Sequence, residues 1–344
     1  MGAVVVDHDA GPLLTECVRS LLDDGAAPVV VVDNGASGSA RRALAPLLAE
    51  RPAADVLVVD PGRNLGFGSG VNRGLAVLSG LVPPAEWVLV SNPDLRVHAG
   101  SLTALRSALE TRPAWAMVGP RIFTDHGDVY PSVRCFPSFV DAAGHALLAL
   151  FAPENRFTRR YNPGPPEGDG TVEAGWISGS CFMARRRALE ELGGFDESYF
   201  MYNEDMDLCW RAHQAGWGVG FTGAAGVTHV QGHSTARHPY AMLLAHHRSA
   251  LHYAVRTTSG WRRLALPLAV IVLGLRFVLG AARLATQGPR AAEGAEPTGP
   301  AAVTPVAAAH TSAASPVTPA AVTPVTPVTP AAPAAPHAPA APQA

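Results

Sequence analysis

The sequence contains no lysine, because all 26 basic residues among its 344 are arginine. A GC-rich coding sequence produces this bias, so the absence carries no functional meaning by itself. The chain also has no excess of positive charge, since its formal net charge is −2 at pH 7. A general nucleic-acid-binding protein needs a basic face to neutralise phosphates. The composition therefore argues against that class and favours small-molecule partners.

Cysteine is scarce, and its four positions are far apart with no C-x-x-C pair: Cys17, Cys135, Cys181 and Cys209. This spacing suggests neither a zinc knuckle nor a disulfide framework. The chain enters the apolar run "AVVV" almost directly after Met1. We therefore expect no cleavable signal peptide and a location in the reducing cytosol.

Periodic patterning is missing from the last part of the chain. A chain of this length can bury a large core and has room for two domains. From about residue 287 onward it consists mainly of Ala, Pro, Thr and Val, with runs such as "VTPVTPVTPAAPAAP" and no aromatic residue. This composition predicts a disordered, partly polyproline-II tail over residues 287–344.

The first hundred residues, in contrast, alternate β-branched runs with amphipathic helical patterns. The runs are "AVVV" (3–6), "VVVVD" (29–33), "DVLVVD" (55–60) and "WVLVSNPD" (87–94). Such apolar runs are typical of a parallel sheet covered by helices on both faces. Ligands of open α/β sheets collect at the carboxyl ends of the strands. Three of the runs end there on an acid: Asp33, Asp60 and Asp94.

The glycine-rich stretch "GRNLGFGSGVNRGL" (62–75) is not a G-x-G-x-x-G fingerprint, because Val71 or Arg73 stands where the third glycine belongs. It also follows the third strand rather than the first. These two facts exclude a Rossmann dehydrogenase. They leave a helix N-terminus flanked by Asn64 and Asn72, with glycines that let a ligand approach the backbone.

Three short motifs each have two interpretations that the sequence leaves open. In "VVDNGASG", Asp33 suits either a nucleobase or ribose contact or the cap of the following helix. In "VLVSNPDL", Asp94 suits either a hard divalent cation or an ordinary turn. In "VTHVQGHST", His229 and His233 have metal-ligand spacing only on a helix, yet their surroundings predict a strand. We favour His229 as a ligand, with a structural histidine as the alternative.

The stretch "MYNEDMDLCW" (201–210) crowds Glu204, Asp205 and Asp207 into four positions. On a helix that begins near Asn203, these acids occupy the first turn, where the helix dipole favours negative charge. The preceding run "GGFDESYFMY" adds aromatic side chains that favour packing of the helix start against the interior. We expect that packing to leave one carboxylate facing a cleft.

The C-terminal part predicts a helix near 238–257, followed by "WRRLALPLAVIVLGLRFVLGAARLA" (261–285). We count its apolar run as shorter than the roughly 20 residues that span a bilayer, with Arg276 as an interruption. Arg276 and Arg283 share one helical face because they are seven residues apart. This pattern favours an interfacial helix on a membrane, with a spanning helix or a buried core helix as alternatives.

Taken in order, the motifs resemble the family-2 nucleotide-sugar glycosyltransferases with the GT-A fold. The matching pieces lie within residues 3–235 and are "VVDNGASG", "NLGFGSGVNRGL", "VLVSNPD", "WISGSCFMARRRALEELGGFDESYFMYNEDMDLCWRAHQAGW" and "HVQGHS". The resemblance implies an α/β GT-A domain over 1–235, with a Rossmann-like mixed sheet and helices on both faces. A helical, membrane-associated segment (236–286) and the disordered tail (287–344) would follow.

The resemblance also implies roles for residues at matching positions. Asp205 matches the general base, and Asp94 and His229 match residues that hold a divalent cation, Mg²⁺ or Mn²⁺. The nucleotide-sugar site would include Asp33, Asn34, Asn64, Gly66, Asn72, Asn92 and Asp94. The acceptor site would include Trp176, Ser178, Gly179 and Glu204. The chain departs from the family in two places, with Asn92 at the first position of the Asp-x-Asp element and with Asp7 and His8 where relatives commonly have Thr-Tyr.

Four further stretches, "DVYPSVRCFPS", "HSTARHP", "AHHRSALHY" and "SGWRR", resemble one branch of this family. Its members transfer L-rhamnose from dTDP-L-rhamnose, with inversion, to the 3-hydroxyl of GlcNAc-diphospho-polyprenol, and so build the linker between peptidoglycan and arabinogalactan. The resemblance implies a peripheral enzyme on the inner face of the cytoplasmic membrane. The alternatives are transfer of another sugar, such as galactofuranose or mannose, and a non-catalytic membrane-associated scaffold.

Overall fold

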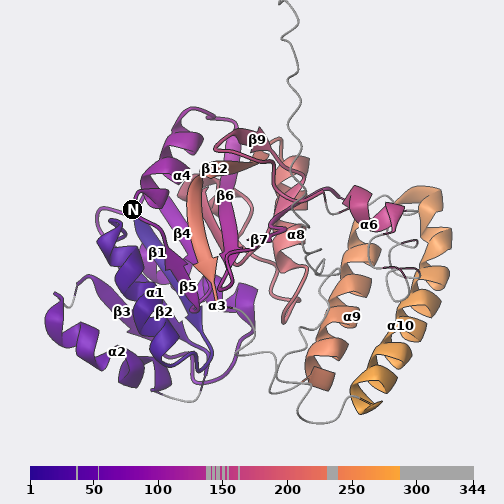
Figure 1. Cartoon of the computed structure of the whole chain (residues 1–344), viewed down its shortest axis with the longest axis horizontal. Coiled ribbons are helices and arrows are strands. Elements are labelled where there is room, and N and C mark those ends of the chain that lie inside the picture. The colour runs from indigo at the N-terminus through magenta and orange to yellow at the C-terminus, as the bar shows by residue number, and fades with distance from the viewer. Residues whose placement is uncertain are drawn as a thin grey trace, which may run out of the picture. The chain divides into compact units, whose positions relative to one another are not determined.

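The computed structural model describes residues 1–35, 38–52, 54–136, 141, 144, 148, 152, 155–161, 163–230 and 239–286 (Figure 1). All of them belong to one compact unit. The predicted tail (287–344) and His233 lie outside the described residues.

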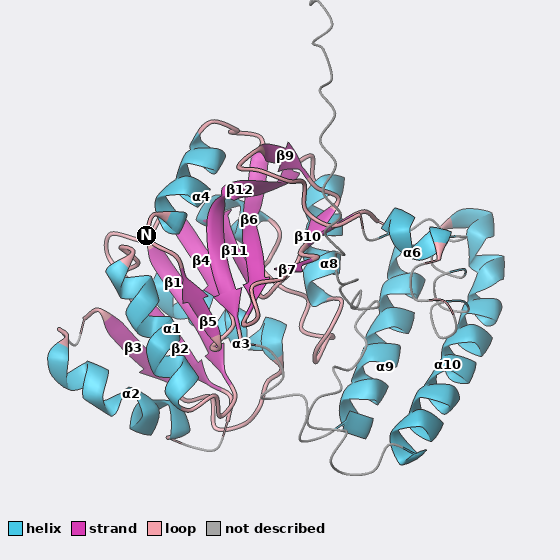
Figure 2. Ribbon diagram, in the orientation of Figure 1, coloured by secondary structure: helices cyan, strands magenta, loops and turns pink. Residues whose placement is uncertain are grey.

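The N-terminal half has the alternating strands and helices that the sequence predicts (Figure 2). Its elements are β1 (Gly2–Asp7), α1 (Pro12–Asp23), β2 (Val29–Asp33), α2 (Ser39–Glu50), β3 (Val56–Val59), α3 (Phe67–Ser79), β4 (Trp87–Ser91), β5 (Leu95–Val97) and α4 (Ser101–Glu110). Strands β1, β2 and β4 are buried along their whole length, as expected for β-branched runs covered on both faces.

The second half completes the sheet. It contains β6 (Trp115–Thr124), β7 (Val129–Tyr130), β8 (Val133–Arg134), α6 (Arg156–Tyr161), β9 (Thr171–Glu173), β10 (Trp176–Ile177), β11 (Cys181–Arg185), α7 (Arg186–Glu191), α8 (Glu204–Gln214) and β12 (Gly218–His229). The order of strands is β3-β2-β1-β4-β11-β6-β12-β5, with β7 beside β6 and β9 beside β12. A separate small sheet pairs β8 with β10.

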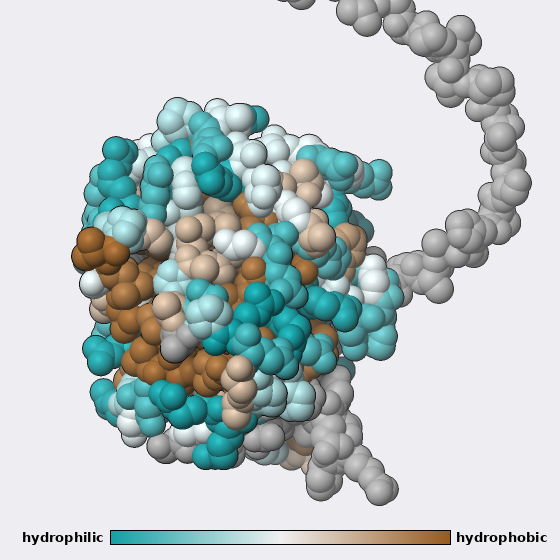
Figure 3. Space-filling model, turned by 90° about the vertical axis from the view of Figure 1, so that its left-hand side faces the viewer, coloured by the Kyte–Doolittle hydropathy of each residue, from teal (hydrophilic) through white to brown (hydrophobic). Residues whose placement is uncertain are grey.

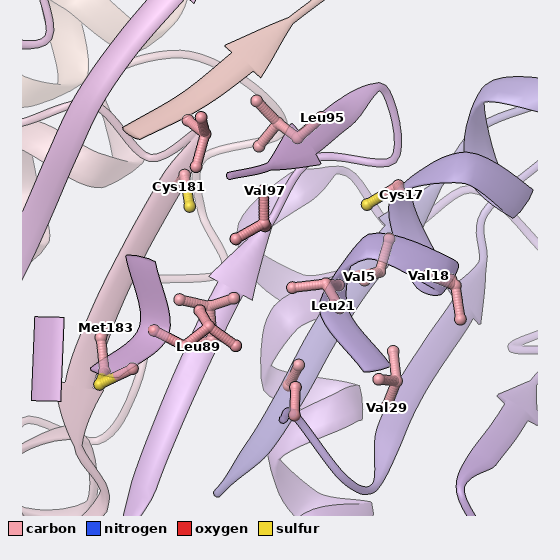
Figure 4. Packing of buried hydrophobic residues seen from close by; sticks show 14 of the residues in the cluster. Val5, Cys17, Val18, Leu21, Val29, Leu89, Leu95, Val97, Cys181 and Met183 are labelled. Carbon is pink, nitrogen blue, oxygen red and sulfur yellow. The ribbon is translucent and has the colours of Figure 1, made fainter. Parts of the chain in front are cut away.

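The sheet is mixed, which confirms the predicted fold class. β3, β2, β1 and β4 run parallel, whereas β11 is antiparallel to both of its neighbours, β4 and β6. Alternate side chains feed two apolar layers, since Val5 packs on one face and Val4 on the other. Figure 4 shows part of the first layer, which includes Val5 of β1, Leu21 of α1 and Leu89 of β4.

β3 is an edge strand of the sheet. Its Leu57, Val58 and Val59 are only partly buried. Figure 3, which views the side of the molecule that carries β3 and α2, shows hydrophobic side chains gathered on this face.

The C-terminal described segment contains α9 (Pro239–Thr257), the 3₁₀ helix η1 (Gly260–Ala265) and α10 (Leu266–Thr286). α9 and α10 pack side by side (Figure 2). The segment Gly260–Thr286 is 27 residues long and contains an 18-residue window with a mean hydropathy of 2.3, so its length and composition suffice to cross a membrane. The prediction that this segment is too short to span a bilayer is therefore wrong.

Arg276 also does not interrupt an apolar surface. Its side chain is buried, whereas the exposed face of α10 carries Leu268, Ile271, Leu275 and Val278. An arginine in the middle of the run has little effect on the outward surface when it is buried against a neighbouring helix. A count of apolar residues along the helix does not show that Arg276 is buried, because it does not distinguish buried from exposed positions.

Candidate active site

Asp7 and Asp33 are neighbours at the carboxyl ends of β1 and β2. The Asp33 carboxylate accepts hydrogen bonds from Ser39 Oγ at 2.9 Å and from the backbone N–H of Ala40 at 3.2 Å. Of the two interpretations left open for Asp33, the structure therefore shows the cap of α2. A nucleotide contact by the same carboxylate is still a prediction.

Asp7 is the least solvated acid at this edge, with an exposed fraction of 1%. One carboxylate oxygen accepts the backbone N–H of Ala10 at 3.1 Å, and the other has no hydrogen-bond partner. Burial raises the pKa of Asp7 to about 6, and the negative charge of Asp33 adds to this shift.

We expect Asp7→Asn to stabilise the protein above pH 6. Between about pH 4 and pH 6 the native Asp7 holds a proton that the unfolded chain has lost, so wild-type stability falls as pH rises through this window. Asparagine has no such cost, and the expected gain above pH 6 is about 2–3 kcal/mol. Urea unfolding at pH 4 and pH 7.5 measures it. An equal change of stability with pH in both proteins would contradict the assignment.

The loop before α3 is tied to β2 by Asn34. Asn34 Nδ2 donates to the Gly66 carbonyl at 2.8 Å, and Asn64 Oδ1 accepts the Gly66 N–H at 2.8 Å. Gly66 has a φ of 84°, and a Cβ at this position would lie 2.1 Å from the Phe200 carbonyl oxygen. Only glycine fits, and it lets the N-terminus of α3 contact the segment that leads into α8.

Asn72 uses its amide group within the protein. Its Oδ1 accepts the Phe195 N–H at 2.9 Å, and its Nδ2 donates to the Phe195 carbonyl and to Glu197 Oε1. Asn72 thus holds the turn after α7. These bonds account for the presence of an amide at this position, and a contact with the nucleotide is still a prediction. Asn64 and Asn72 line a cavity of about 560 Å³ together with Arg63 and Arg73.

His229 is far from Asn92 and Asp94 in the sequence, but the fold brings the three side chains together. Antiparallel pairing places His229 opposite Leu95, and the Val230 N–H bonds the Asp94 carbonyl. His229 Nε2 lies 3.0 Å from Asp94 Oδ1 and 3.4 Å from Asn92 Nδ2. β12 is a strand here, as predicted, so His229 acts from a strand end rather than from a helix.

The carboxylate of Asp94 and the amide oxygen of Asn92 suit a hard divalent cation such as Mg²⁺ or Mn²⁺, and the imidazole nitrogen of His229 suits a transition-metal ion. No group of three or more His, Cys, Asp or Glu side chains that could hold a metal occurs in the described part of the chain. A cation at Asp94 and His229 would therefore need further ligands from substrate oxygens or water.

Asp205 is connected to this trio by residues 179 and 180, which directly precede β11. Asp205 Oδ2 accepts the Gly179 N–H at 2.8 Å, and the Asn92 N–H bonds the Ser180 carbonyl at 2.8 Å. A Cβ at position 179 would lie 3.0 Å from Asp205 Cβ, so glycine permits the close approach. Residues 179 and 180 thus join the predicted general base to the predicted cation ligands.

Glu204 and Asp205 differ in their hydrogen bonds. Asp205 is partly exposed, and its carboxylate accepts N–H bonds from Gly179 and Met206. Glu204 is 6% exposed, and its Oε2 has no partner. Burial, and then the charge of Asp205, raise the pKa of Glu204. Burial also raises the pKa of Asp205, but its N–H bonds oppose that shift. We therefore assign the proton to Glu204 and the negative charge to Asp205.

Asp207 has a structural environment. It is fully buried and lies between two arginines, with Arg211 Nε at 2.7 Å and Arg256 Nε at 3.0 Å. Asp207 thus pairs with two arginines. These ion pairs use the Asp207 carboxylate to hold α8 in place. Asp205 is then the acid that we predict to act on a substrate.

Trp176, predicted to line the acceptor site, is 5% exposed and donates its Nε1–H to the Cys135 carbonyl. The Arg134 guanidinium lies 4.8 Å above its ring. Ser178, another predicted acceptor residue, is buried and hydrogen-bonds Ser180 Oγ at 3.0 Å. Both side chains bond other groups of the protein, and a direct acceptor contact by either is still a prediction.

Arg134 was not assigned a role from the sequence. Its charge lowers the pKa of Asp205, although its own exposed fraction is 6%. Cross-strand pairing of β8 with β10 puts it opposite Trp176, 42 positions away. The motif "DVYPSVRCFPS" contains Arg134, but no local signal indicated that it would face the base.

We expect Arg134→Gln to move the acidic limb of the pH–rate profile to higher pH. Removal of the positive charge leaves the pKa of Asp205 higher, so more of the base is protonated at neutral pH. Turnover should fall at pH 7 and recover partly at alkaline pH. Arg134→Lys keeps the charge and should keep the limb near its wild-type position. Identical profiles for the Gln variant and the wild type would rule out this electrostatic role.

The mixed α/β sheet, with a carboxylate–histidine pair at strand ends and an acid at a helix N-terminus, agrees with a glycosyltransferase of the GT-A fold. Residues 1–248 match the model of the family described as "Glycosyltransferase like family 2". The chain belongs to this family and is a glycosyltransferase.

Curated relatives and solved structures agree with this assignment. The chain is 38% identical over 268 residues to the N-acetylglucosaminyl-diphospho-decaprenol L-rhamnosyltransferase of Mycobacterium tuberculosis, covering 76% of this chain and 85% of the relative. It is 28% identical to rhamnosyltransferase WbbL of Escherichia coli K12, over 56% of this chain and 70% of the relative. The crystal structure of GalNAc-T7 with UDP, GalNAc and Mn²⁺ has a TM-score of 0.51 at 14% identity, which shows a similar fold. That match covers 67% of this chain and 43% of GalNAc-T7.

Proposed function

We propose that the enzyme transfers L-rhamnose from dTDP-L-rhamnose to the 3-hydroxyl of GlcNAc-diphospho-polyprenol. The observation that carries the choice of substrates is the 38% identity to the mycobacterial rhamnosyltransferase over 85% of that protein. The geometry supports the reaction class, because one acid is available as a base next to a pair suited to a cation. Synthesis of a cell-wall linker is the corresponding process.

In this mechanism Asp205 accepts the proton of the acceptor hydroxyl as the oxygen attacks the anomeric carbon. The N–H of Gly179 orients the Asp205 carboxylate, and the protonated Glu204 avoids a second negative charge beside it. Attack from the face opposite the leaving nucleotide inverts the anomeric centre. A β-linked donor therefore gives an α-rhamnoside.

Asp94 and His229 would hold a divalent cation, Mg²⁺ or Mn²⁺, with Asn92 beside them. When bound, a cation supplies positive charge that stabilises the departing diphosphate. We expect removal of divalent ions with EDTA to abolish transfer, and addition of Mn²⁺ or Mg²⁺ to restore it. Full activity after chelation and gel filtration would show that the pair serves another purpose. Asp94→Asn should raise the cation concentration needed for half-maximal activity.

We also propose that the hairpin of α9 and α10 holds the enzyme against the inner face of the cytoplasmic membrane, where the lipid-linked acceptor resides. Trp261 and Leu264 are 80% and 84% exposed, and Arg262 and Arg263 lie between them. Apolar and basic side chains side by side suit an anionic lipid surface. Sedimentation with phosphatidylglycerol vesicles tests this, with Trp261→Ser and Leu264→Ser expected to weaken binding. Equal sedimentation of the variants and the wild type would contradict it.

The donor is tested by incubating purified enzyme separately with dTDP-rhamnose, UDP-galactofuranose and GDP-mannose and a GlcNAc-diphospho-lipid acceptor. We expect turnover with dTDP-rhamnose. Turnover with only one of the other donors would replace the proposed substrate by that sugar. No turnover with any donor, in protein that binds dTDP, would favour the scaffold alternative.

A further inference from the structure

The segment "AHHRSALHY" (245–253) has no role in the mechanism above. It lies in α9, which packs against α10 on one side (Figure 1). Hydrogen bonds, ion pairs and ring contacts also join α9 to the segment between Asp196 and Asp207. That segment leads into α8 and contains the general base assigned under the proposed function.

Two residues of α9 contact the turn immediately before Asp205. Ser249 is 6% exposed, and its Oγ donates to the Met201 carbonyl at 2.8 Å. The His246 ring packs edge-on against the Tyr202 ring, with centroids 5.5 Å apart. Both contacts therefore fall within four residues of the base.

This turn needs support because its backbone is unusual. Tyr202 and Asn203 have φ angles of 69° and 61°, the left-handed region that favours glycine. A residue with a side chain is strained in this region, and surrounding contacts must hold it there. No side-chain bond caps the N-terminus of α8 at Asn203. The position of Asp205 therefore depends on what holds the turn.

The contacts continue along the same face of α9. His252 hydrogen-bonds Ser198 Oγ at 2.9 Å, and its ring lies edge-on to Tyr199. Arg256 forms ion pairs with both Asp196 and Asp207. Positions 246, 249, 252 and 256 are three or four residues apart, so they line one helical face. One face of α9 thus holds the segment at both of its ends.

We propose that α9 positions the general base, with Ser249 and His246 as positioning residues for Asp205. The ion pairs of Arg256 join α9 to Asp196 and to Asp207 of α8 at positions other than the strained turn that Ser249 contacts. The effect of the Ser249 bond is to fix the backbone that carries Asp205. The helix that packs on the lipid-facing α10 is then also the helix that sets the base.

The test compares Ser249→Ala with Thr257→Ala, in full-length protein. Thr257 is a matched control, because its hydroxyl bonds the Tyr253 carbonyl within α9 and touches no part of the turn. We expect Ser249→Ala to lower kcat about tenfold, since misplacement of a catalytic group by about 1 Å can cost up to 100-fold. The KM for the donor should stay unchanged. Thr257→Ala should match the wild type, and Ser249→Thr, which keeps the hydroxyl, should recover most of the activity.

Hydrogen exchange of the amides at 201–206 gives a readout that needs no substrate. We expect faster exchange in Ser249→Ala and in His246→Ala than in Thr257→Ala. Equal amide exchange and equal kcat in Ser249→Ala and Thr257→Ala would overturn the proposal. A fall in kcat in Ser249→Ala that is not relieved in Ser249→Thr would also overturn it. The exchange result stands even if the wild type transfers a different sugar. A failure of the proposed function is therefore distinguishable from a failure of this inference.

Discussion

Asp205→Asn is expected to lower kcat by about 100-fold or more, because general-base catalysis contributes on that order. Asparagine has nearly the same shape and keeps an oxygen that can accept the Gly179 N–H. The variant should therefore fold and bind dTDP as the wild type does. A steady-state assay with dTDP-rhamnose and a GlcNAc-diphospho-lipid measures the loss of turnover.

Asp60→Asn is a suitable control for this variant. Asp60 is also an acid at a strand end, but it is exposed, and its carboxylate accepts the N–H of Gly62 in its own turn. We expect it to leave kcat unchanged. Wild-type turnover in Asp205→Asn, or an equal loss in Asp60→Asn, would show that the base has been assigned to the wrong residue.

The sheet and the edge that binds ligands could be predicted from the sequence because their signals are local. Uninterrupted apolar runs marked β1, β2 and β4, and each is buried along its whole length. Chain direction then placed the acids that end these runs at one edge. Asp94 and His229 were predicted as partners from the order of motifs, and antiparallel pairing of β5 with β12 brings them to 3.0 Å.

Other contacts between segments far apart in the sequence could not be predicted. The burial of Arg134 depends on Trp176, and the support of the turn at Met201 depends on Ser249. Neither pairing follows a spacing rule. Asp33 and Asn72 were predicted to contact the nucleotide sugar, yet both side chains bond the protein itself. A carboxylate or an amide can satisfy nearby backbone groups as well as those of a ligand.

Asp207→Ala is expected to destabilise the fold by about 3–5 kcal/mol, since removing one partner of a buried ion pair leaves charge uncompensated. Asp207 is the fully buried acid that the largely buried Arg211 and the more exposed Arg256 both contact. Denaturant unfolding of the full-length chain measures the loss. Asp23→Ala is the control, because Asp23 pairs with Arg51 at the surface, where such a pair contributes about 0–1 kcal/mol.

The comparison of Asp205 with Asp207 separates two uses of negative charge within one turn of α8. Loss of the Asp207 carboxylate removes the counter-charge of two arginines that join α8 to the turn after α7 and to α9. Loss of the Asp205 charge removes a proton acceptor and leaves those connections intact. We therefore expect opposite profiles, with lost turnover and normal stability in Asp205→Asn, and lost stability in Asp207→Ala. Equal destabilisation by Asp207→Ala and Asp23→Ala would mean that the buried network does not hold the helix, and the division of roles within the acidic cluster would fail with it.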